Sequence, residues 1–205
     1  MKLTVLIPTW KRGDLLEKCL QSLAEQERQA DEVIVVYRDV DPEAQEYISH
    51  FAEKLPLVRV MVEAPGVIHA ENMGLEKVTS DIVCFLDDDA EVPAHWLKLI
   101  EEHFSRDSSL AGVGGPDYIV LDGDYRKECH TVGKITWYGK VIGNHHQKVV
   151  RLQEVDVLKG VNMSFRKSFI EPLDEKLHSE HSYGNGSQWE LDLCLKVKAK
   201  GTINL

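Results

Sequence analysis

Residues 82–89 read Ile-Val-Cys-Phe-Leu-Asp-Asp-Asp, and this stretch decides the fold. Its first five residues are all apolar and predict a strand buried on both faces, which is typical of a parallel sheet. Parallel α/β sheets bind ligands beyond the carboxyl ends of their strands, so Asp87, Asp88 and Asp89 are expected to stand over a binding cleft. A solvated acidic loop is the alternative, and the position directly after a buried strand favours the cleft.

Similar apolar runs precede this stretch and alternate with helical patterns. Asp41 followed by Pro42 is typical of a helix start. The alternation predicts an α/β fold with a doubly wound, Rossmann-like and mostly parallel sheet. The earlier strands are predicted at residues 3–7, 32–37 and 58–62, with helical patterns at 15–23, 44–51 and 70–75.

After Asp89 the alternation loosens, and a smaller region with antiparallel strands is expected. Asp122 with Gly123 is typical of a hairpin turn. Gly201 is expected to end the last helix, whose final turn is rich in lysine. The later predicted elements are a helix at 96–104, an irregular stretch at 110–150, strands at 155–158 and 163–165, and a helix at 187–200.

The composition is that of a soluble globular domain. The chain has 205 residues, of which 43% are hydrophobic and 28% charged. With 24 Lys and Arg against 34 Asp and Glu, the formal net charge is −10. Proteins that bind nucleic acid or anionic membranes carry clustered basic residues, so the acidic balance argues against nucleic acid as a partner. An anionic ligand would need local basic residues or a metal ion.

The cysteines and apolar runs predict the compartment. Four cysteines lie far apart and form no Cys-x-x-Cys pair, which is typical of buried thiols in a reducing environment. The apolar run from Leu3 is interrupted at Pro8, too early for a signal peptide, and no later run has the length of a membrane helix. We therefore expect a cytoplasmic protein, whose association with the inner face of a membrane would be peripheral.

The ordered motifs of the chain resemble those of the family 2 glycosyltransferases, which have the GT-A fold. The resemblance implies transfer of a sugar, with inversion, from a nucleotide-diphosphate sugar to a hydroxyl of a glycan, lipid-linked or small-molecule acceptor. A UDP-linked sugar is the first donor expected. The motifs are Leu-Ile-Pro-Thr-Trp-Lys-Arg at 6–12, the strand at 33–36, the segment 65–75, Phe-Leu-Asp-Asp-Asp at 85–89 with Pro93 and Trp96, residues 160–166, and Trp-Glu-Leu-Asp-Leu at 189–193.

The resemblance also implies roles for single residues and divides the domain. Residues 1–115 would form the nucleotide-sugar-binding half and 116–205 the acceptor-binding half, truncated at its C-terminal end. Asp87 and Asp88 would contact the ribose and diphosphate. The other donor-side positions are Pro8, Thr9 and Arg12 along the nucleotide, Arg38 and Asp39 after the second strand, and Gly66 and Asn72 in the donor cleft. The acceptor-side positions are Gly160, Asn162, Arg166 and Trp189.

Asp89 would be the metal ligand in this resemblance. Mg²⁺ and Mn²⁺ take carboxylate oxygens together with substrate phosphates, which gives an acidic protein a means of holding an anionic donor. The bound cation would stabilise the departing diphosphate as a Lewis acid.

Glu190 falls where the family places its catalytic base, and a carboxylate there can deprotonate the attacking hydroxyl. Asp192 is the alternative base. Ser187 and Glu190 also form a capping-box pattern, in which both side chains satisfy backbone donors at a helix start. The sequence leaves these roles open.

Some positions depart from the family's pattern. Tyr37 and Arg38 replace the usual acidic pair after the second strand, and Arg38 could meet phosphate or lie on the surface. Glu71 replaces a frequent arginine, which removes one phosphate contact. These departures keep a non-catalytic nucleotide-sugar-binding module as an alternative. A nucleotidyltransferase would need a glycine-rich basic loop after the first strand, where this chain has only Gly13 beside Lys11 and Arg12.

Overall fold

The computed structural model describes residues 1–118, 127–177 and 188–205. It is an α/β fold around a mixed, mostly parallel sheet of seven strands in the order β11-β5-β10-β4-β1-β2-β3. All neighbouring strands are parallel except β10, which runs antiparallel to β4 and β5. The strands are β1 Leu3–Pro8, β2 Glu32–Arg38, β3 Leu57–Val62, β4 Ile82–Phe85, β5 Leu110–Gly114, β10 Met163–Arg166 and β11 Thr202–Asn204.

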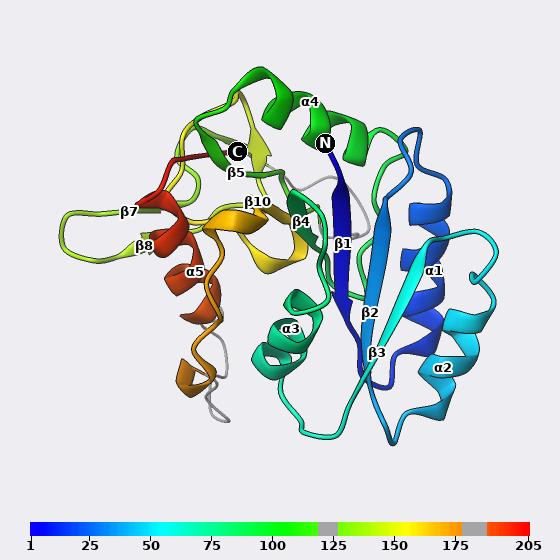
Figure 1. Cartoon of the computed structure of the whole chain (residues 1–205). Coiled ribbons are helices and arrows are strands. Elements are labelled where there is room, and N and C mark those ends of the chain that lie inside the picture. The colour runs from blue at the N-terminus through cyan, green and yellow to red at the C-terminus, as the bar shows by residue number, and fades with distance from the viewer. Residues whose placement is uncertain (119–126, 178–187) are drawn as a thin grey trace.

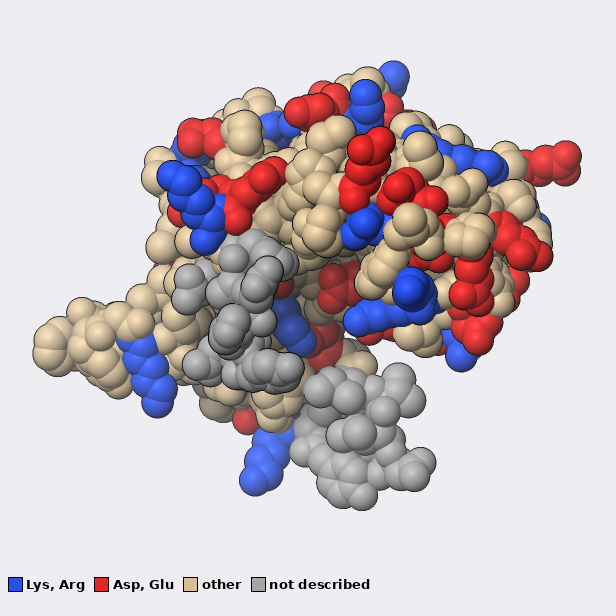
Figure 2. Space-filling model, turned by 90° about the horizontal axis from the view of Figure 1, so that it is seen from below, with Lys and Arg blue, Asp and Glu red and all other residues tan. Residues whose placement is uncertain are grey.

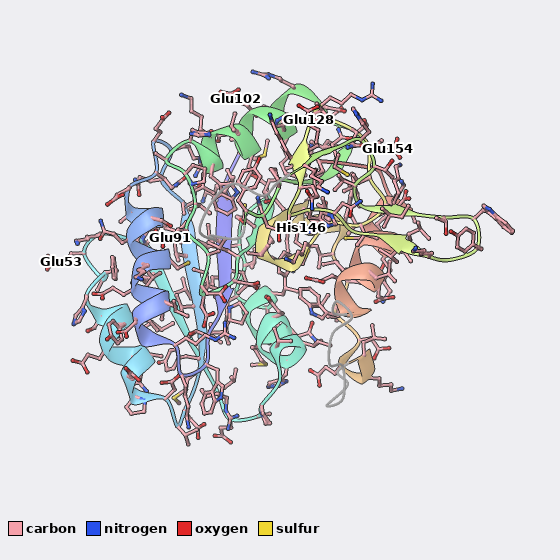
Figure 3. All side chains as sticks on the ribbon, turned by 180° about the vertical axis from the view of Figure 1, so that it is seen from behind. Glu53, Glu91, Glu102, Glu128, His146 and Glu154 are labelled. Atoms are coloured by element: carbon pink, nitrogen blue, oxygen red, sulfur yellow. The ribbon has the colours of Figure 1, made fainter. Side chains whose placement is uncertain are left out.

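Helices cover both faces of this sheet. Figure 1 shows α3 and α5 on one side of the central strands and α1 and α2 on the other, and Figure 3 shows the second side from behind, with Glu53 just beyond α2. The helices are α1 Gly13–Ala24, α2 Pro42–Ser49, α3 Val67–Leu75, α4 Trp96–Arg106 and α5 Gln188–Lys198. The predicted doubly wound arrangement is therefore confirmed.

Two apolar cores follow from the alternation of side chains along the strands. Val5 and Cys84 point into the core under α1, α2 and α4, whereas Leu6 and Phe85 point into the core under α3 and α5. All four side chains are fully buried. Close packing on both faces therefore holds the sheet rigid, and the loops at the carboxyl ends of its strands start from fixed positions.

The strand order reverses beside β1, and this position creates the cleft. From β1 the chain proceeds through α1 to β2 on one side, and after β3 the helix α3 returns the chain to β4 on the other side of β1. The loops that follow β1 and β4 consequently diverge at neighbouring carboxyl ends, which is where open α/β sheets bind ligands.

The second half differs in detail from the sequence-based expectation. The predicted strand at 155–158 is wrong, because these residues are not in a strand. They follow Glu154, which forms an isolated antiparallel bridge with Asn204. The segment expected to be irregular from 110 begins with β5, a strand of the main sheet. The last helix ends at Lys198 rather than at residue 200. The Asp122–Gly123 turn lies outside the described residues.

Small sheets and short helical turns complete the second half. β6 Glu128–Cys129 pairs in parallel with β9 Lys148–Val149, and β7 Lys134–Ile135 pairs antiparallel with β8 Val141–Ile142. Three 3₁₀ turns lie at Gly160–Asn162, Lys167–Phe169 and Glu175–Leu177. The first of these turns leads into β10 and brings Gly160 close to the start of α5.

Candidate active site

A cleft of about 410 Å³ opens at the carboxyl ends of β1, β2 and β4. Figure 2 looks onto this edge of the sheet and shows a hollow in which basic and acidic side chains lie next to each other. The lining combines five segments, namely the β1–α1 loop, the end of β2, the end of β3 with the loop that follows it, the start of α3 and the loop after β4. From the predicted donor side, Pro8, Thr9, Arg12, Arg38, Gly66, Asp87 and Asp88 all line this cleft.

Residues with positive φ shape two walls of the cleft, the start of α3 and the β1–α1 loop. Gly66, at the start of α3, has φ 122°, a conformation that residues with a side chain rarely adopt. Lys11 in the β1–α1 loop also has a positive φ, of 54°. Its N–H donates a hydrogen bond of 2.7 Å to buried Asp41, which also caps α2 by accepting from Ala44 N–H at 3.2 Å. Asp41 therefore fixes this loop to the adjacent helix.

The aspartates after β4 are tied to the β1–α1 loop. Asp88 is only 4% exposed and accepts hydrogen bonds from Thr9 Oγ1 at 2.7 Å and from Arg12 Nη1 at 3.0 Å. Arg12 Nη1 also lies 3.1 Å from Asp89 Oδ2. Burial raises the pKa of Asp88, while the bond from Thr9 and the charge of Arg12 act in the opposite direction. This network joins two loops that are far apart in the sequence.

The surroundings of Asp87 disfavour its ionised form. Burial among the cleft walls, followed by the charges of Asp89 and Asp88, raises its pKa to about 6, against the opposing charges of Lys159 and Arg12. Close carboxylates disfavour one another's charged form. The cleft thus concentrates negative charge at one point and would gain from a bound cation.

Glu190 lies across the site, in the first turn of α5. Its Oε1 accepts a hydrogen bond from the backbone N–H of Gly160. Asp192, two residues further on, instead forms an ion pair with Lys196 one turn along the same helix, at 2.6 Å. The geometry therefore separates the two candidate bases: Glu190 faces the Gly160 turn and Asp192 lies along the outer surface of the helix. Ser187 of the capping-box alternative lies outside the described residues.

Several other predicted site residues have structural partners away from the cleft. Asn72 on α3 forms two hydrogen bonds with the backbone of Leu173. Its Nδ2 donates to the Leu173 carbonyl at 2.9 Å, and its Oδ1 accepts from the Leu173 N–H at 2.8 Å. Asn162 accepts a hydrogen bond from Trp96 Nε1 at 3.0 Å. Asp39 is exposed after β2, 3.6 Å from Arg38 Nε. These three residues do not line the cleft.

Arg166 and Trp189 are also held by packing. Arg166 pairs with Ile82 at the amino end of β4, at the opposite edge of the sheet from the cleft, because β10 is antiparallel. Its guanidinium donates to the carbonyls of Leu110 and Phe104, at 2.8 and 3.2 Å. Trp189 is buried, with its ring centroid 6.1 Å from that of Phe85. Of the four expected acceptor-side residues, Gly160 is the one whose backbone N–H contacts Glu190, and the acceptor-binding roles stay predictions.

Three residues of the site were not singled out from the sequence. Trp10 is 42% exposed in the cleft, with Lys11 Nζ 4.8 Å and Arg38 Cζ 5.1 Å from its ring centroid. Lys159 lies near enough to Asp87 to affect its pKa and forms an ion pair with Asp117. Trp10 lies inside the 6–12 motif, which was a usable signal, whereas Lys159 had none beyond its place beside Gly160. Glu71, the third, was noted only as a departure from the family's pattern.

The described residues contain no group of three or more His, Cys, Asp or Glu side chains arranged to hold a metal ion. The acidic side chains labelled in Figure 3 come from separate elements spread around the molecule. All four cysteines are free. Within residues 1–118, 127–177 and 188–205, none of the helices has the length and apolarity needed to cross a membrane.

Comparison with known proteins identifies the family. The family model described as glycosyl transferase family 2 matches residues 4–173, which include every wall of the cleft. The chain belongs to glycosyltransferase family 2. A transferase role follows from this membership, and the resemblance noted in the motifs is confirmed.

Relatives and solved structures agree with the family. An uncharacterised glycosyltransferase from Haemophilus influenzae is 28% identical over 83% of this chain and 62% of its own length. The crystal structure of residues 1–349 of TarS from S. aureus, in complex with UDP-GlcNAc, is 18% identical and superposes with a TM-score of 0.72 over 100% of this chain and 55% of that one. This likeness confirms the GT-A fold.

A mannosyltransferase from Pyrobaculum calidifontis, solved with GDP-Man and Mn²⁺, is 28% identical with a TM-score of 0.52, over 58% of this chain and 36% of that one. This chain therefore spans less than two thirds of each of these three proteins.

Proposed function

We propose that this glycosyltransferase moves a sugar from a nucleotide-diphosphate sugar to an acceptor hydroxyl with inversion, assisted by a divalent metal ion. The observation that carries the proposal is the cleft that Asp87 and Asp88 line at the carboxyl edge of the sheet. Asp87 and Glu190 both act electrostatically on buried Glu71, so the two carboxylates lie near the same residue. The Pyrobaculum mannosyltransferase, which was solved with GDP-Man and Mn²⁺, supports a donor and a metal of these classes.

The nucleotide is proposed to lie between the β1–α1 loop and the end of β2. Trp10 offers an exposed aromatic face for a base, and Arg38 beside it adds a positive charge. Arg12, half exposed, has donors directed toward the aspartates and would also meet phosphate oxygens. UDP is the first nucleotide to test and GDP the second.

Asp89 is proposed as the protein's metal ligand, and the residues present fit this role. Its carboxylate is 46% exposed and lies 3.1 Å from Arg12, which lines the cleft. Burial, followed by the charges of Asp89 and Asp88, raises the pKa of Asp87 beside it. Mg²⁺ or Mn²⁺ is often held by one or two carboxylates together with substrate phosphates, so a larger protein cage is not required. When bound, such an ion supplies Lewis-acid stabilisation to the departing diphosphate.

Glu190 is proposed as the general base. The N–H of Gly160 donates to one carboxylate oxygen and so fixes the orientation of the side chain. In this orientation the carboxylate would accept the proton of the attacking hydroxyl. The hydroxyl oxygen forms the new bond to the anomeric carbon while the bond to the diphosphate breaks. A single displacement of this kind inverts the anomeric configuration.

The acceptor is proposed to be a glycan, lipid-linked or small-molecule hydroxyl that enters on the Gly160 side. We propose a cytoplasmic location, with peripheral contact to the inner membrane face when the acceptor is lipid-linked. The sequence-based alternative, a binding module without turnover, uses the same cleft but would not need an oriented Glu190.

Turnover assays separate the two functions. Sugar nucleotides of UDP and GDP are screened with a panel of acceptors for Mn²⁺-dependent release of nucleoside diphosphate. Wild type, Glu190→Gln and Asp89→Ala are compared, with Asp192→Asn as the matched carboxylate control on the same helix. Release that exceeds the Glu190→Gln background supports the enzyme. Metal-dependent binding of UDP or GDP without such release, for every pair, supports the binding module instead.

A further inference from the structure

Glu71 is a buried carboxylic acid without a hydrogen-bond partner at one oxygen. It lies in the middle of α3 and is 3% exposed. Its Oε2 makes no hydrogen bond to any of the residues that the structure describes. Buried polar groups normally have partners because an unsatisfied group loses its interactions with water and gains none in return. A side chain of this kind therefore points to a ligand.

The surroundings of Glu71 connect it to both sides of the proposed reaction centre. Asp87, from the loop after β4, and Glu190, from α5, are the charged groups close enough to act on it. Asp87 also lines the cleft, and Glu71 lies buried behind that part of the cleft wall. The three carboxyl groups come from three different elements and meet between the diphosphate side and the acceptor side.

Electrostatics restricts what this space can bind. Burial, followed by the charges of Asp87 and Glu190, raises the pKa of Glu71 well above its usual value, which favours the protonated acid. A protonated carboxyl group donates one hydrogen bond and accepts others. A phosphate would meet two neighbouring carboxylates and is disfavoured here, and the proposed nucleotide position lies on the other side, at Trp10 and Arg38. A neutral polyhydroxyl group fits the remaining requirements.

We propose that Glu71 is a specificity-determining residue that hydrogen-bonds a hydroxyl group of the transferred sugar. The inference rests on the proposed function, since it assumes that a nucleotide sugar occupies the cleft. It adds a claim that the proposed function does not make: Glu71 contacts the sugar itself. Loss of this contact should weaken binding of the sugar nucleotide and not of the free nucleoside diphosphate, which has no sugar to be transferred.

Calorimetric binding tests this difference directly. UDP with UDP-GlcNAc, and GDP with GDP-mannose, are titrated in Mn²⁺ into wild type, Glu71→Gln and Glu71→Asp. Glu76→Gln is the matched control, because it makes the same change at an exposed position at the end of the same helix. The pair studied further is the one whose sugar nucleotide wild type binds more tightly than its diphosphate.

For Glu71→Asp, whose carboxyl group is one methylene shorter, we expect the diphosphate Kd to stay within about twofold and the sugar-nucleotide Kd to rise about tenfold, the effect of one lost hydrogen bond to a ligand. Glu71→Gln keeps a donor and an acceptor at the same place and should stay near wild type, and Glu76→Gln should change neither value. Circular dichroism of both Glu71 variants checks that they are folded.

The outcomes separate the two proposals. Equal weakening of both ligands, or unchanged binding of both, in folded Glu71→Asp overturns the inference while leaving the proposed function standing. If wild type binds none of the four nucleotides in Mn²⁺, the proposed function fails and the inference fails with it.

Discussion

Replacement of Glu71 by Gln should make the stability of the protein less sensitive to pH. The unfolded chain releases the Glu71 proton near the usual pKa of 4.5, whereas the folded protein holds it to a higher pH. Between those two pKa values the folded state binds more protons than the unfolded state, so stability falls as pH rises. Glutamine has nearly the same shape and does not titrate, so the variant should lose this dependence.

The magnitude follows from the burial of the carboxyl group. Each pH unit over which the folded protein keeps a proton that the unfolded chain has released is worth about 1.4 kcal/mol. Relative to wild type, the free energy of unfolding of Glu71→Gln should therefore gain up to about 1.4 kcal/mol per pH unit above the usual pKa of 4.5, until wild-type Glu71 ionises in the folded protein. The gain should be smallest at the acidic end, where wild-type Glu71 is protonated in both states.

Urea denaturation followed by circular dichroism at a series of pH values measures this gain, with Glu76→Gln as the exposed control. The difference between variant and wild type should grow with pH only for Glu71. A difference that stays constant across the series, or that shrinks as pH rises, would refute the reasoning, because it would mean that Glu71 is ionised in the folded protein or has found a partner.

Three further variants probe the cleft and its supports. Arg12→Ala should weaken UDP or GDP binding by about 1.5–3 kcal/mol, the value of a hydrogen bond to a charged group, as measured by calorimetry. Asp41→Ala should lower the free energy of unfolding by about 1–2 kcal/mol in urea, since it removes both the α2 cap and the acceptor for Lys11 N–H. Arg166→Ala should lower the melting temperature while leaving nucleotide affinity unchanged, because its partners lie at the opposite edge of the sheet; a loss of affinity would return it to the site.

The sequence predicts the first half of the fold well because its periodicities are strong. Each strand there is mostly apolar, with β4 apolar throughout and β3 interrupted only by Arg59, and local pattern identifies it. The second half depends on long-range pairing: β10 and β11 are short and join β5 in the main sheet only after a long excursion of the chain. Val155, Val157 and Leu158 are apolar because they pack in a core, and burial without pairing gives the same sequence pattern as a strand.

The site was predictable to the same extent. Asp87 and Asp88 line the cleft as predicted, because a strand end places them there, whereas the role of Glu190, taken from its motif, stays a prediction. The roles of Asn72 and Arg166 could not be foreseen, since the same polar side chains serve equally well to hold Leu173 or the carbonyls at the end of α4. The importance of Glu71 depends on the absence of a hydrogen-bond partner in three dimensions, which no sequence pattern records.

The central claim is that Glu190 performs the proton transfer while the Asp87–Asp89 loop holds the donor. The turnover number of Glu190→Gln, measured with saturating donor and Mn²⁺ beside its Kd for the free nucleoside diphosphate, tests it most directly. The account predicts a fall in turnover of about 10²-fold or more, the contribution of a general base, with the Kd unchanged. Turnover equal to that of wild type, or a loss fully explained by weaker nucleotide binding, would contradict it.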